Sequence, residues 1–549
     1  MIGLATLLLP AALADTLPPG SVIDEALSAR VSEDALDSLG VLVPGFIPAD
    51  IPVDDISESV DLFICEPGIW MSNIQVDVAF SWVDITTVPG EIQLAAGLDI
   101  SINSPSNPFG LDLDYCLGDT SCPGYVAPFE VVINTSLGLE ILEDGEGNKY
   151  LDATLGALDY DLGLSPSDDI YLDCGIQTLE EVLGYLGISI YDFVFDLAIG
   201  TLDDSIGDLT ADLEPTIEEA FSALTISEEV EILDGVVLDI ELFPSDLVID
   251  DNGIQLIMGG GADAPASECV AAYDPGGSLL TESFTPDPTG EGAIEAALSD
   301  EFANQALYAL WRSGLLCYEI ADLQGLTLDT GLLGLLAGDA FDELFPEASP
   351  IAMITRPGAP PTAVYDGAND IGVDIRDLGL DIYADLDGRS TRLLNLDLGL
   401  EAGVDLNFDG ATGDLGIGIN LDADSFAVDV GHNEYAPDSS EAIAGNFAGV
   451  FDSLVGPLLD GLLGDSLAFT LPAFEGLGLT SIDVDAAGAD SDWLGLNAYV
   501  GLVAYESGGC DEEGNCDTGC EGGCASSSGR SRLAMFLFPI FLALVRRRD

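Results

Sequence analysis

Long stretches in which apolar and polar residues alternate one by one run through much of this chain of 549 residues. In the stretch "LNLDLGLEAGVDLNF" at 394–408, every second residue is apolar, and three of the residues between them are acidic. Because successive side chains of a strand point to opposite faces, the stretch predicts a long strand with one buried face and one acidic, solvated face. The same period of two runs through 74–82, 129–141 and 415–423.

In the stretch at 74–82, the alternation puts Ile74, Val76, Val78, Phe80 and Trp82 on one predicted buried face. Segments rich in turn-forming residues separate the predicted strands, "EDGEGNK" at 143–149 and "FDGATGD" at 408–414. Such segments between alternating runs are typical of hairpin connections. Long strands joined in this way favour strongly twisted, curled antiparallel sheets over short-stranded sandwiches.

Two stretches, 202–224 and 441–463, have a different period, with apolar residues three and four positions apart. Each of them predicts a long helix with one continuous apolar stripe. Leu209 and Leu213 lie on the first stripe, and Phe447 and Phe451 lie on the second. Each helical stretch follows a run of strands and precedes a pair of closing strands, within 235–260 and 473–502.

The two halves of the chain also open in the same way. In "EALSARVSEDALDSLGVLV" and in "AIEAALSDEFANQALYALWRSGLL", a short strand is followed by a serine and then by a helix that begins with acidic residues. We expect Ser32 and Ser299 to cap these helices. The segment "ALDSL" at 35–39 matches "ALYAL" at 306–310. The repeat predicts two related domains, at 24–268 and 290–504, joined by a Gly- and Pro-rich linker at 269–289.

This order of elements resembles the family of bactericidal/permeability-increasing protein, lipopolysaccharide-binding protein and cholesteryl ester transfer protein. The segments "ARVSEDALDSLGVLV", "LSDEFANQALYALWRSGLL" and "AFEGLGLTSIDVDAAGADSDWLGLNAYVGL" carry the resemblance, which covers nearly the whole body of the chain. It implies an α+β fold made of two tandem tubular lipid-binding domains. In each of them, a long amphipathic helix is wrapped in a highly curved antiparallel sheet.

A sheet curled around an amphipathic helix leaves a slot between the two, and an apolar slot holds an acyl chain. Burying such a chain gains about 0.8 kcal/mol per methylene. The candidate lining residues are therefore Leu209, Leu213, Phe447 and Phe451. The alternative is that these side chains fill an ordinary hydrophobic core.

The charge of the chain restricts its partners. Acidic residues number 99 against 12 lysines and arginines, which gives a formal net charge of -87. Such a surface repels nucleic acid, so we expect no nucleic-acid partner. In the host-defence members of the family a cationic tip meets the phosphates of lipopolysaccharide, but residues 1–311 here contain only Arg30 and Lys149 as basic residues. The resemblance therefore supports apolar-ligand binding and argues against endotoxin recognition.

No residue pattern indicates catalysis, a metal site or a cofactor. "DLNFDG" at 405–410 matches the start of a calcium-binding loop, but the twelfth position is Gly416 in place of a bidentate glutamate, so we interpret it as a strand and a turn. The single histidine, His432, lies in a polar segment, and no G-x-S-x-G segment is present. We expect a protein that is not an enzyme, with no catalytic residues, metal or cofactor.

The N-terminus and the cysteines favour export. Residues 1–14 contain an apolar run and end in Ala-Leu-Ala, the pattern of a signal peptide, although a positive segment is missing and a buried first helix is the alternative. Ten cysteines and no C-x-x-C pair favour disulfides over zinc. The candidate pairs are Cys116 with Cys122, Cys65 with Cys174, and Cys269 with Cys317.

The C-terminal tail concentrates five of the arginines, Arg530, Arg532, Arg546, Arg547 and Arg548. They flank 533–545, an uncharged stretch that is too short to span a membrane well as a helix. A Gly/Ser/Cys linker at 505–529 precedes the tail at 530–549. This layout resembles the C-terminal sorting signals of myxobacteria and related bacteria, which implies cleavage by a sorting protease and surface attachment through Cys520 or Cys524. An uncleaved tail anchor is the alternative.

These observations predict an exported protein of the outer membrane or cell surface of a Gram-negative bacterium. It would hold or transfer an apolar lipid or phospholipid and attach to the membrane through its C-terminal anchor. The alternative is a structural or adhesive surface protein with filled slots and no lipid ligand. The order and periodicity of the elements favour neither function over the other.

Overall fold

The computed structural model describes residues 16–39, 50–52, 55–59, 68–114, 119–145, 147–157, 159–162, 169–173, 225–233, 236–281, 284–290, 292–320, 322–323, 326–341, 343–365, 369–421, 425–447, 449, 469–470, 477–488 and 490–503. Several predictions from the sequence fall outside these residues. They concern the signal peptide, the helix at 202–224 with Leu209 and Leu213, Phe451, the linker and tail at 505–549, and five of the cysteines: Cys65, Cys116, Cys174, Cys520 and Cys524.

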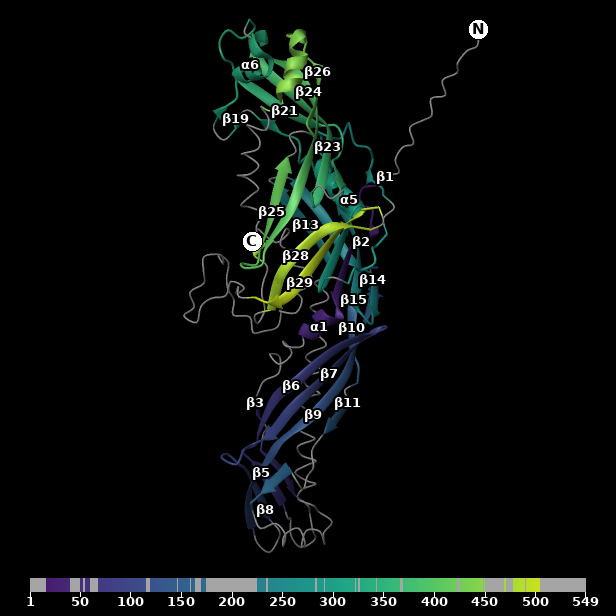
Figure 1. Ribbon diagram of the computed structural model, residues 1–549, viewed down its shortest axis with the longest axis vertical. Coiled ribbons are helices and arrows are strands. Elements are labelled where there is room, and N and C mark those ends of the chain that lie inside the picture. Colours follow the sequence, from purple (N-terminus) through teal and green to yellow (C-terminus); the bar gives the residue numbers. More distant parts are fainter. Residues whose placement is uncertain are drawn as a thin grey trace, which may run out of the picture.

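Antiparallel strands make up most of the described structure and form three large sheets of ten, seven and eight strands. Figure 1 shows an elongated molecule with the ten-stranded sheet at one end, the seven-stranded sheet in the middle and the eight-stranded sheet at the other end. The sheets are open and curled, as the long alternating stretches predicted.

The ten-stranded sheet belongs to the first half of the chain. Its longest strand, β9, has 25 residues and pairs with β7, β8, β10, β11 and β12. The strand order along the sheet is β3-β6-β7-β9-β8-β5-β4. The bounds are β3 Asp50–Pro52, β4 Ile56–Ser59, β5 Gly68–Ser72, β6 Gln75–Val88, β7 Glu91–Ile102, β8 Phe109–Asp114, β9 Asp119–Glu143, β10 Lys149–Leu155, β11 Asp159–Leu162 and β12 Ile170–Leu172.

One face assignment in this sheet was wrong. Val76 and Val78 are buried on β6 as the alternation predicted, but Trp82 is 40% exposed. The register between β6 and β7 shifts between Phe80 and Trp82. After the shift, the odd-numbered residues of β6 lie on the buried face in place of the even-numbered ones. The indole of Trp82 lies over Gly97, where an added Cβ would clash with its Nε1 atom, and Nε1 donates to Glu130 Oε1 at 3.2 Å.

The seven-stranded sheet contains strands from both halves, in the order β13-β14-β15-β2-β17-β29-β28. The opening strands of the halves, β2 and β17, pair with each other at its centre. Each opening strand also pairs with a closing strand of its own half, β15 or β29. The bounds are β2 Ile23–Ser32, β13 Ile226–Leu233, β14 Val236–Asp250, β15 Gly253–Asp263, β17 Ile294–Ser299, β28 Leu477–Ala487 and β29 Trp493–Leu502.

The register of this sheet reveals an internal two-fold relation. Ser32 and Ser299 both end an opening strand and begin a helix, so the residues three positions before them, Ala29 and Ala296, are equivalent. Ala29 and Ala296 are paired directly with each other. A local two-fold axis therefore passes between them, and the strands on either side of it are arranged symmetrically within this sheet.

Both predicted helix caps are present. The Oγ atom of Ser32 accepts from the backbone N–H of Ala35 at 3.2 Å at the start of α1, Glu33–Leu39. The Oγ atom of Ser299 accepts from Phe302 N–H at 3.2 Å at the start of α5, Asp300–Ser313. Counted from the caps, 35–39 corresponds to 302–306. The sequence match of 35–39 with 306–310 was therefore displaced by about one helical turn.

The eight-stranded sheet belongs to the second half and has the order β18-β21-β23-β24-β25-β27, with β22 on β23 and β26 on β24. The long strand β24 and its hairpin with β25 confirm the alternation predicted at 394–408. The bounds are β18 Glu319–Ile320, β21 Ile351–Pro357, β22 Thr362–Val364, β23 Ile371–Leu386, β24 Arg389–Asp409, β25 Asp414–Leu421, β26 Ala427–His432 and β27 Phe469–Thr470. The helical segments here are α6 Gly331–Ala337, the 3-10 turns Gly338–Phe341 and Pro437–Ser439, and a helix over 440–447.

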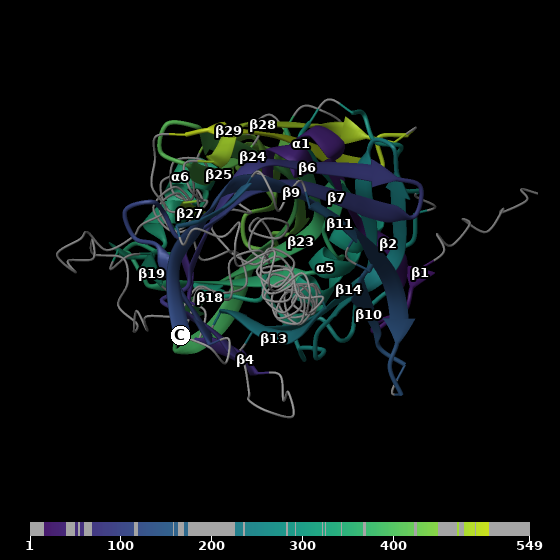
Figure 2. The same cartoon turned by 90° about the horizontal axis from the view of Figure 1, so that it is seen from below.

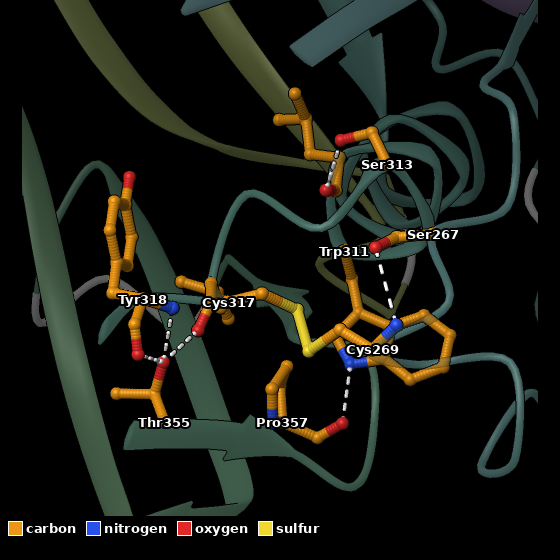
Figure 3. The surroundings of a disulfide bond; sticks show 10 residues. Ser267, Cys269, Trp311, Ser313, Cys317, Tyr318, Thr355 and Pro357 are labelled. Carbon is orange, nitrogen blue, oxygen red and sulfur yellow. Dashed lines mark hydrogen bonds between the residues drawn. A yellow bond between two sulfur atoms is a disulfide. The ribbon is translucent and has the colours of Figure 1, made fainter. Parts of the chain in front are cut away.

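The segment between the halves is fastened to the body of the protein. Cys269 and Cys317, one of the pairs proposed from the sequence, form a disulfide with their Cα atoms 6.4 Å apart, just after the end of α5 (Figure 3). Trp311 of α5 donates from Nε1 to the Pro357 carbonyl of β21 at 3.2 Å. Cys122 is also disulfide-bonded, and its predicted partner Cys116 lies outside the described residues.

The described residues also form two small sheets, β1 Thr16–Leu17 with β16 Ser278–Leu279, and β19 Asp322–Leu323 with β20 Leu326–Thr327.

Candidate functional site

The inner face of the first-half sheet is a continuous apolar surface across β6, β7 and β9. The even-numbered positions of β7 from Ile92 to Ile102 are all apolar, and all but Leu94 are buried. Their partners on the two neighbouring strands are apolar as well, apart from Thr87 and Thr135. On this face lie Val76, Val78, Phe80, Val83 and Ile85 of β6, and Phe129, Val131, Ile133 and Leu137 of β9.

Burial varies along this face. Leu98 and Ile100 in the middle of β7 are 3% and 2% exposed, whereas Leu94, Ile85 and Leu137 near one end are only half-buried. Seen along the long axis of the molecule, the strands β6, β7 and β9 follow one arc (Figure 2). The opposite face of β7 carries Gln93, Gly97, Asp99 and Ser101, so the polar side of the sheet is separate from the apolar side.

The inner face of the second-half sheet is filled by named side chains. Leu394 and Leu396 of β24 and Ile382 of β23 are fully buried. They pack in one cluster with Leu333 and Leu336 of α6 and with residues of the helix over 440–447. This arrangement is a packed hydrophobic core.

Of the four residues proposed to line a slot, only Phe447 lies in the described part of the chain. Its side chain is 5% exposed and belongs to the same cluster as Ile443, Leu394 and Leu396. Leu209, Leu213 and Phe451 lie outside the described residues, so their role stays a prediction. The half-buried apolar residues of β6 and β7 were not proposed from the sequence, because alternation identifies a buried face but gives no measure of how well it is covered.

The segment that matched a calcium loop is a strand and a turn. Asp405, Asn407 and Asp409 lie in β24, and Asp409 receives hydrogen bonds from the backbone N–H groups of Ala411 and Gly413. Within the described ranges, histidine, cysteine and carboxylate side chains form no group of three arranged to hold a metal ion. His432 ends β26, where its Nδ1 atom lies 3.9 Å from the Glu434 carboxylate.

A cleft of about 370 Å³ lies at the edge of the central sheet, beside β13, β14 and the segment before β2. Four carboxylates line it, those of Glu229, Asp239, Glu241 and Asp263. Desolvating ionised groups to admit an acyl chain is costly, so this cleft does not suit an apolar ligand.

Among the described residues, no helix has both the length and the apolar character needed to cross a bilayer.

Among known proteins, only solved structures show a similarity to this chain. No family model and no curated protein matches the chain. The crystal structure of lipopolysaccharide binding protein is similar over 87% of this chain and 100% of its own length, with 13% identity and a TM-score of 0.47. P47 of Clostridium botulinum E1 is similar over 87% of this chain and 100% of its own, with 9% identity and a TM-score of 0.21. Takeout 1 of Epiphyas postvittana covers 33% of this chain and 88% of its own, with 11% identity and a TM-score of 0.20.

These similarities are too distant to support conclusions about activity. The strand order and register themselves show two curled sheets joined through a symmetric central sheet.

Proposed function

We propose that this chain is an exported, surface-anchored lipid-binding protein that holds or transfers an apolar lipid at the cell envelope. The observation that carries the proposal is the continuous apolar inner face of β6, β7 and β9, with Leu94, Ile85 and Leu137 only half-buried at one end. An acyl chain lying along this face would cover apolar surface that the described side chains leave partly exposed.

The energetics of this surface favour a lipid over a polar ligand. Each methylene of a buried acyl chain contributes about 0.8 kcal/mol, so a chain of ordinary length gains more than enough to remain bound. A polar ligand would have to satisfy its hydrogen bonds against Val, Ile, Leu and Phe side chains, which offer no partners. Within this proposal the first half is the lipid-binding half, because the described core of the second half is already filled by its own side chains.

The experiment that tests lipid binding is mass spectrometry of an organic extract of the purified protein. We expect a lipid with at least one acyl chain at a fixed ratio to protein, and we expect the purified protein to take up a fluorescent phospholipid after delipidation. Absence of co-purifying lipid together with absence of uptake would favour the alternative, a structural or adhesive surface protein with filled slots.

Export and anchoring are part of the same proposal and have their own test. The support is the apolar N-terminus, the Gly/Ser/Cys linker and the arginine-flanked apolar tail, with Cys520 or Cys524 as the point of attachment. Deletion of 530–549 removes both the apolar stretch and the arginines, so we expect the protein to leave the cell surface and enter the medium or periplasm. A deleted form that stays on the surface would exclude the sorting function of the tail.

We also propose that the protein is not an enzyme, since its single histidine, His432, lies in a polar segment and the sequence contains no G-x-S-x-G segment. Lipid bound by such a protein would be recovered chemically unchanged. The extract and uptake experiments test this directly, because hydrolysed or modified phospholipid after incubation would contradict it.

A further inference from the structure

The few basic residues of the chain are paired unequally. Outside the tail there are seven basic residues. In most of the described ion pairs, a basic residue lies beside one or two carboxylates that balance or exceed its charge. Arg30 pairs with Glu295, Arg376 with Asp374, and Arg312 with both Asp263 and Asp274. In the part of the chain that the structure describes, one carboxylate is shared by two cations only at Asp381, which pairs with Arg356 and Arg392.

This cluster lies on the face of the second-half sheet opposite to its core. Asp381 of β23 stands between Ile354 of β21 and Asn395 of β24 in the register. Arg356 Nε lies 2.6 Å from Asp381 Oδ2, and Arg392 Nη1 lies 3.3 Å from Asp381 Oδ1. Asn395 Nδ2 donates to Oδ1 at 3.0 Å, and Arg356 Nη2 donates to the Tyr383 hydroxyl at 3.3 Å.

Burial divides the cluster into a fixed base and an open surface. The Asp381 side chain is 0% exposed, whereas the side chains of Arg356 and Arg392 are 45% and 41% exposed. A buried carboxylate must be paired with a cation, and one arginine is sufficient to balance its charge. The second arginine therefore gives the cluster a net charge of about +1, on a chain whose other described ion pairs are neutral or acidic.

We propose that Arg356 and Arg392, held in place by the buried carboxylate of Asp381, form a binding site for one phosphate group. A guanidinium carries five N–H donors in a planar fork that matches a phosphate oxyanion, and the hydrogen bonds of the cluster use one of them on each arginine. The shared carboxylate orders both side chains in advance, so less rotational freedom is lost when the anion binds.

The strongly acidic surroundings restrict the ligand to a compact one. A polyanion such as nucleic acid would meet the negative field of the whole chain. A single phosphate meets the two guanidinium groups and, on the same face, the carboxylate of Asp397, which pairs with Gly379 two residues before Asp381. Charges that lie more than about 10 Å away are largely screened at 0.1 M ionic strength. The site is on the opposite face from the apolar core, so it does not depend on the proposed lipid-binding surface.

The test is equilibrium dialysis of the full chain against radiolabelled inorganic phosphate in buffered sodium chloride. We expect saturable binding by the wild-type protein and at least a tenfold loss of affinity in Arg392→Gln, which leaves the Arg356–Asp381 pair intact. The matched control is Arg376→Gln, which removes the same charge from an arginine that is 77% exposed and paired one to one with Asp374. We expect its affinity for phosphate to remain within twofold of wild type.

Two outcomes would overturn the site. One is the absence of saturable phosphate binding by the wild-type protein, and the other is an equal loss in Arg392→Gln and Arg376→Gln, which would show a non-specific charge effect. Thermal unfolding of both variants ensures that the comparison is made on folded protein. Because removing one cation leaves Asp381 paired with Arg356, we expect both variants to fold.

A second experiment, co-sedimentation with vesicles, identifies the source of the phosphate group. Vesicles of phosphatidylcholine with and without phosphatidic acid are sedimented with the wild-type protein and with Arg392→Gln. Arg392-dependent co-sedimentation with the phosphatidic acid vesicles would identify a lipid headgroup as the source. Phosphate binding in dialysis without such co-sedimentation would identify a soluble phosphate ester, and either result supports the site.

Discussion

Leu94 in the first half and Leu396 in the second half both lie on the inner face of a long antiparallel strand. Leu94 is half-buried, whereas Leu396 is 0% exposed beneath α6 and the helix over 440–447. The two halves begin and end alike, with capped helices after β2 and β17 and closing hairpins in one shared sheet. Among the described residues, the strands of both halves carry an apolar inner face, and the described helices of the second half pack on that face and bury it completely around Leu396.

The outer faces of the halves differ as well. In the first-half sheet, Trp82 covers Gly97 and donates to Glu130, so an aromatic ring and a carboxylate share the polar side. In the second-half sheet, two arginines cover Asp381. Next to them, Asp397 has a raised pKa because burial and the nearby Asp377 and Asp429 carboxylates disfavour its charged form. The same architecture therefore presents chemically different surfaces at its two ends.

The largest expected effects come from the same substitution in the two halves, Leu94→Trp and Leu396→Trp. Leu396 is closely packed, so the larger ring should overpack the core and lower the free energy of unfolding by about 1–3 kcal/mol or more. At Leu94 the ring should be accommodated with less than about 1 kcal/mol of loss, and it should reduce uptake of a fluorescent phospholipid by occupying its place. Urea unfolding and uptake are measured on both proteins.

Two results would remove the proposed contrast between the halves. If Leu94→Trp destabilises the protein as much as Leu396→Trp, the first-half face is a packed core too. If a folded Leu94→Trp protein takes up lipid as the wild type does, this end of β7 is not part of the binding surface. Leu94→Ala is the matched control, because it removes bulk from the same position and should not reduce uptake by blocking.

The sequence predicted the strands and caps well because their signals are local. Alternation over fifteen residues specifies β24, and a serine before two acidic residues specifies the start of α5. The prediction failed at Trp82, because the shift of register between Phe80 and Trp82 depends on how β6 meets β7. Nothing in residues 74–82 alone determines that pairing.

The candidate sites were less predictable because they depend on contacts between distant residues. The pairing of β2 with β17 brings Ala29 and Ala296 together across the whole first half of the chain, although the repeat itself was visible in the sequence. The sharing of Asp381 by Arg356 and Arg392 needs three strands in register, and each residue alone is an unremarkable polar position. Isolated arginines in an acidic sequence are therefore worth examining for clustering once the strand order is known.

A smaller effect is expected from removing the two equivalent caps, Ser32→Ala and Ser299→Ala. Ser299 is 0% exposed, so its loss leaves the buried Phe302 N–H without its side-chain acceptor, and we expect about 1–2 kcal/mol of destabilisation. Ser32 is half-buried and caps the short helix α1, so we expect about 0.5–1 kcal/mol. Chemical unfolding of both variants measures the difference.

Ser313→Ala serves as the control for this comparison, because its hydroxyl donates to the Leu310 carbonyl at the end of α5 and caps no N-terminus. We expect less than about 0.5 kcal/mol there. Equal costs for Ser32→Ala and Ser299→Ala would show that the two openings contribute alike to stability, despite the difference in helix length and burial.

The smallest expected effect is a change in the pH dependence of stability in Glu301→Gln. Glu301 lies in the first turn of α5, where burial and the neighbouring Asp300 raise its pKa from 4.5 to about 7. The helix N-terminus favours a carboxylate, so a raised pKa means that loss of hydration outweighs this attraction.

Between pH 4.5 and about 7 the folded state retains a proton that the unfolded chain has released. The contribution of this group to the free energy of unfolding is therefore largest below pH 4.5 and falls as the pH rises to about 7. Glu301→Gln should remove this fall, so its stability should gain relative to wild type as the pH rises through the window. Because Glu301 is only half-buried, we expect a small effect, measured by urea unfolding at several pH values beside Glu347→Gln, an exposed carboxylate. A Glu301→Gln profile parallel to that of wild type across this window would show that the group titrates alike in the folded and unfolded chains.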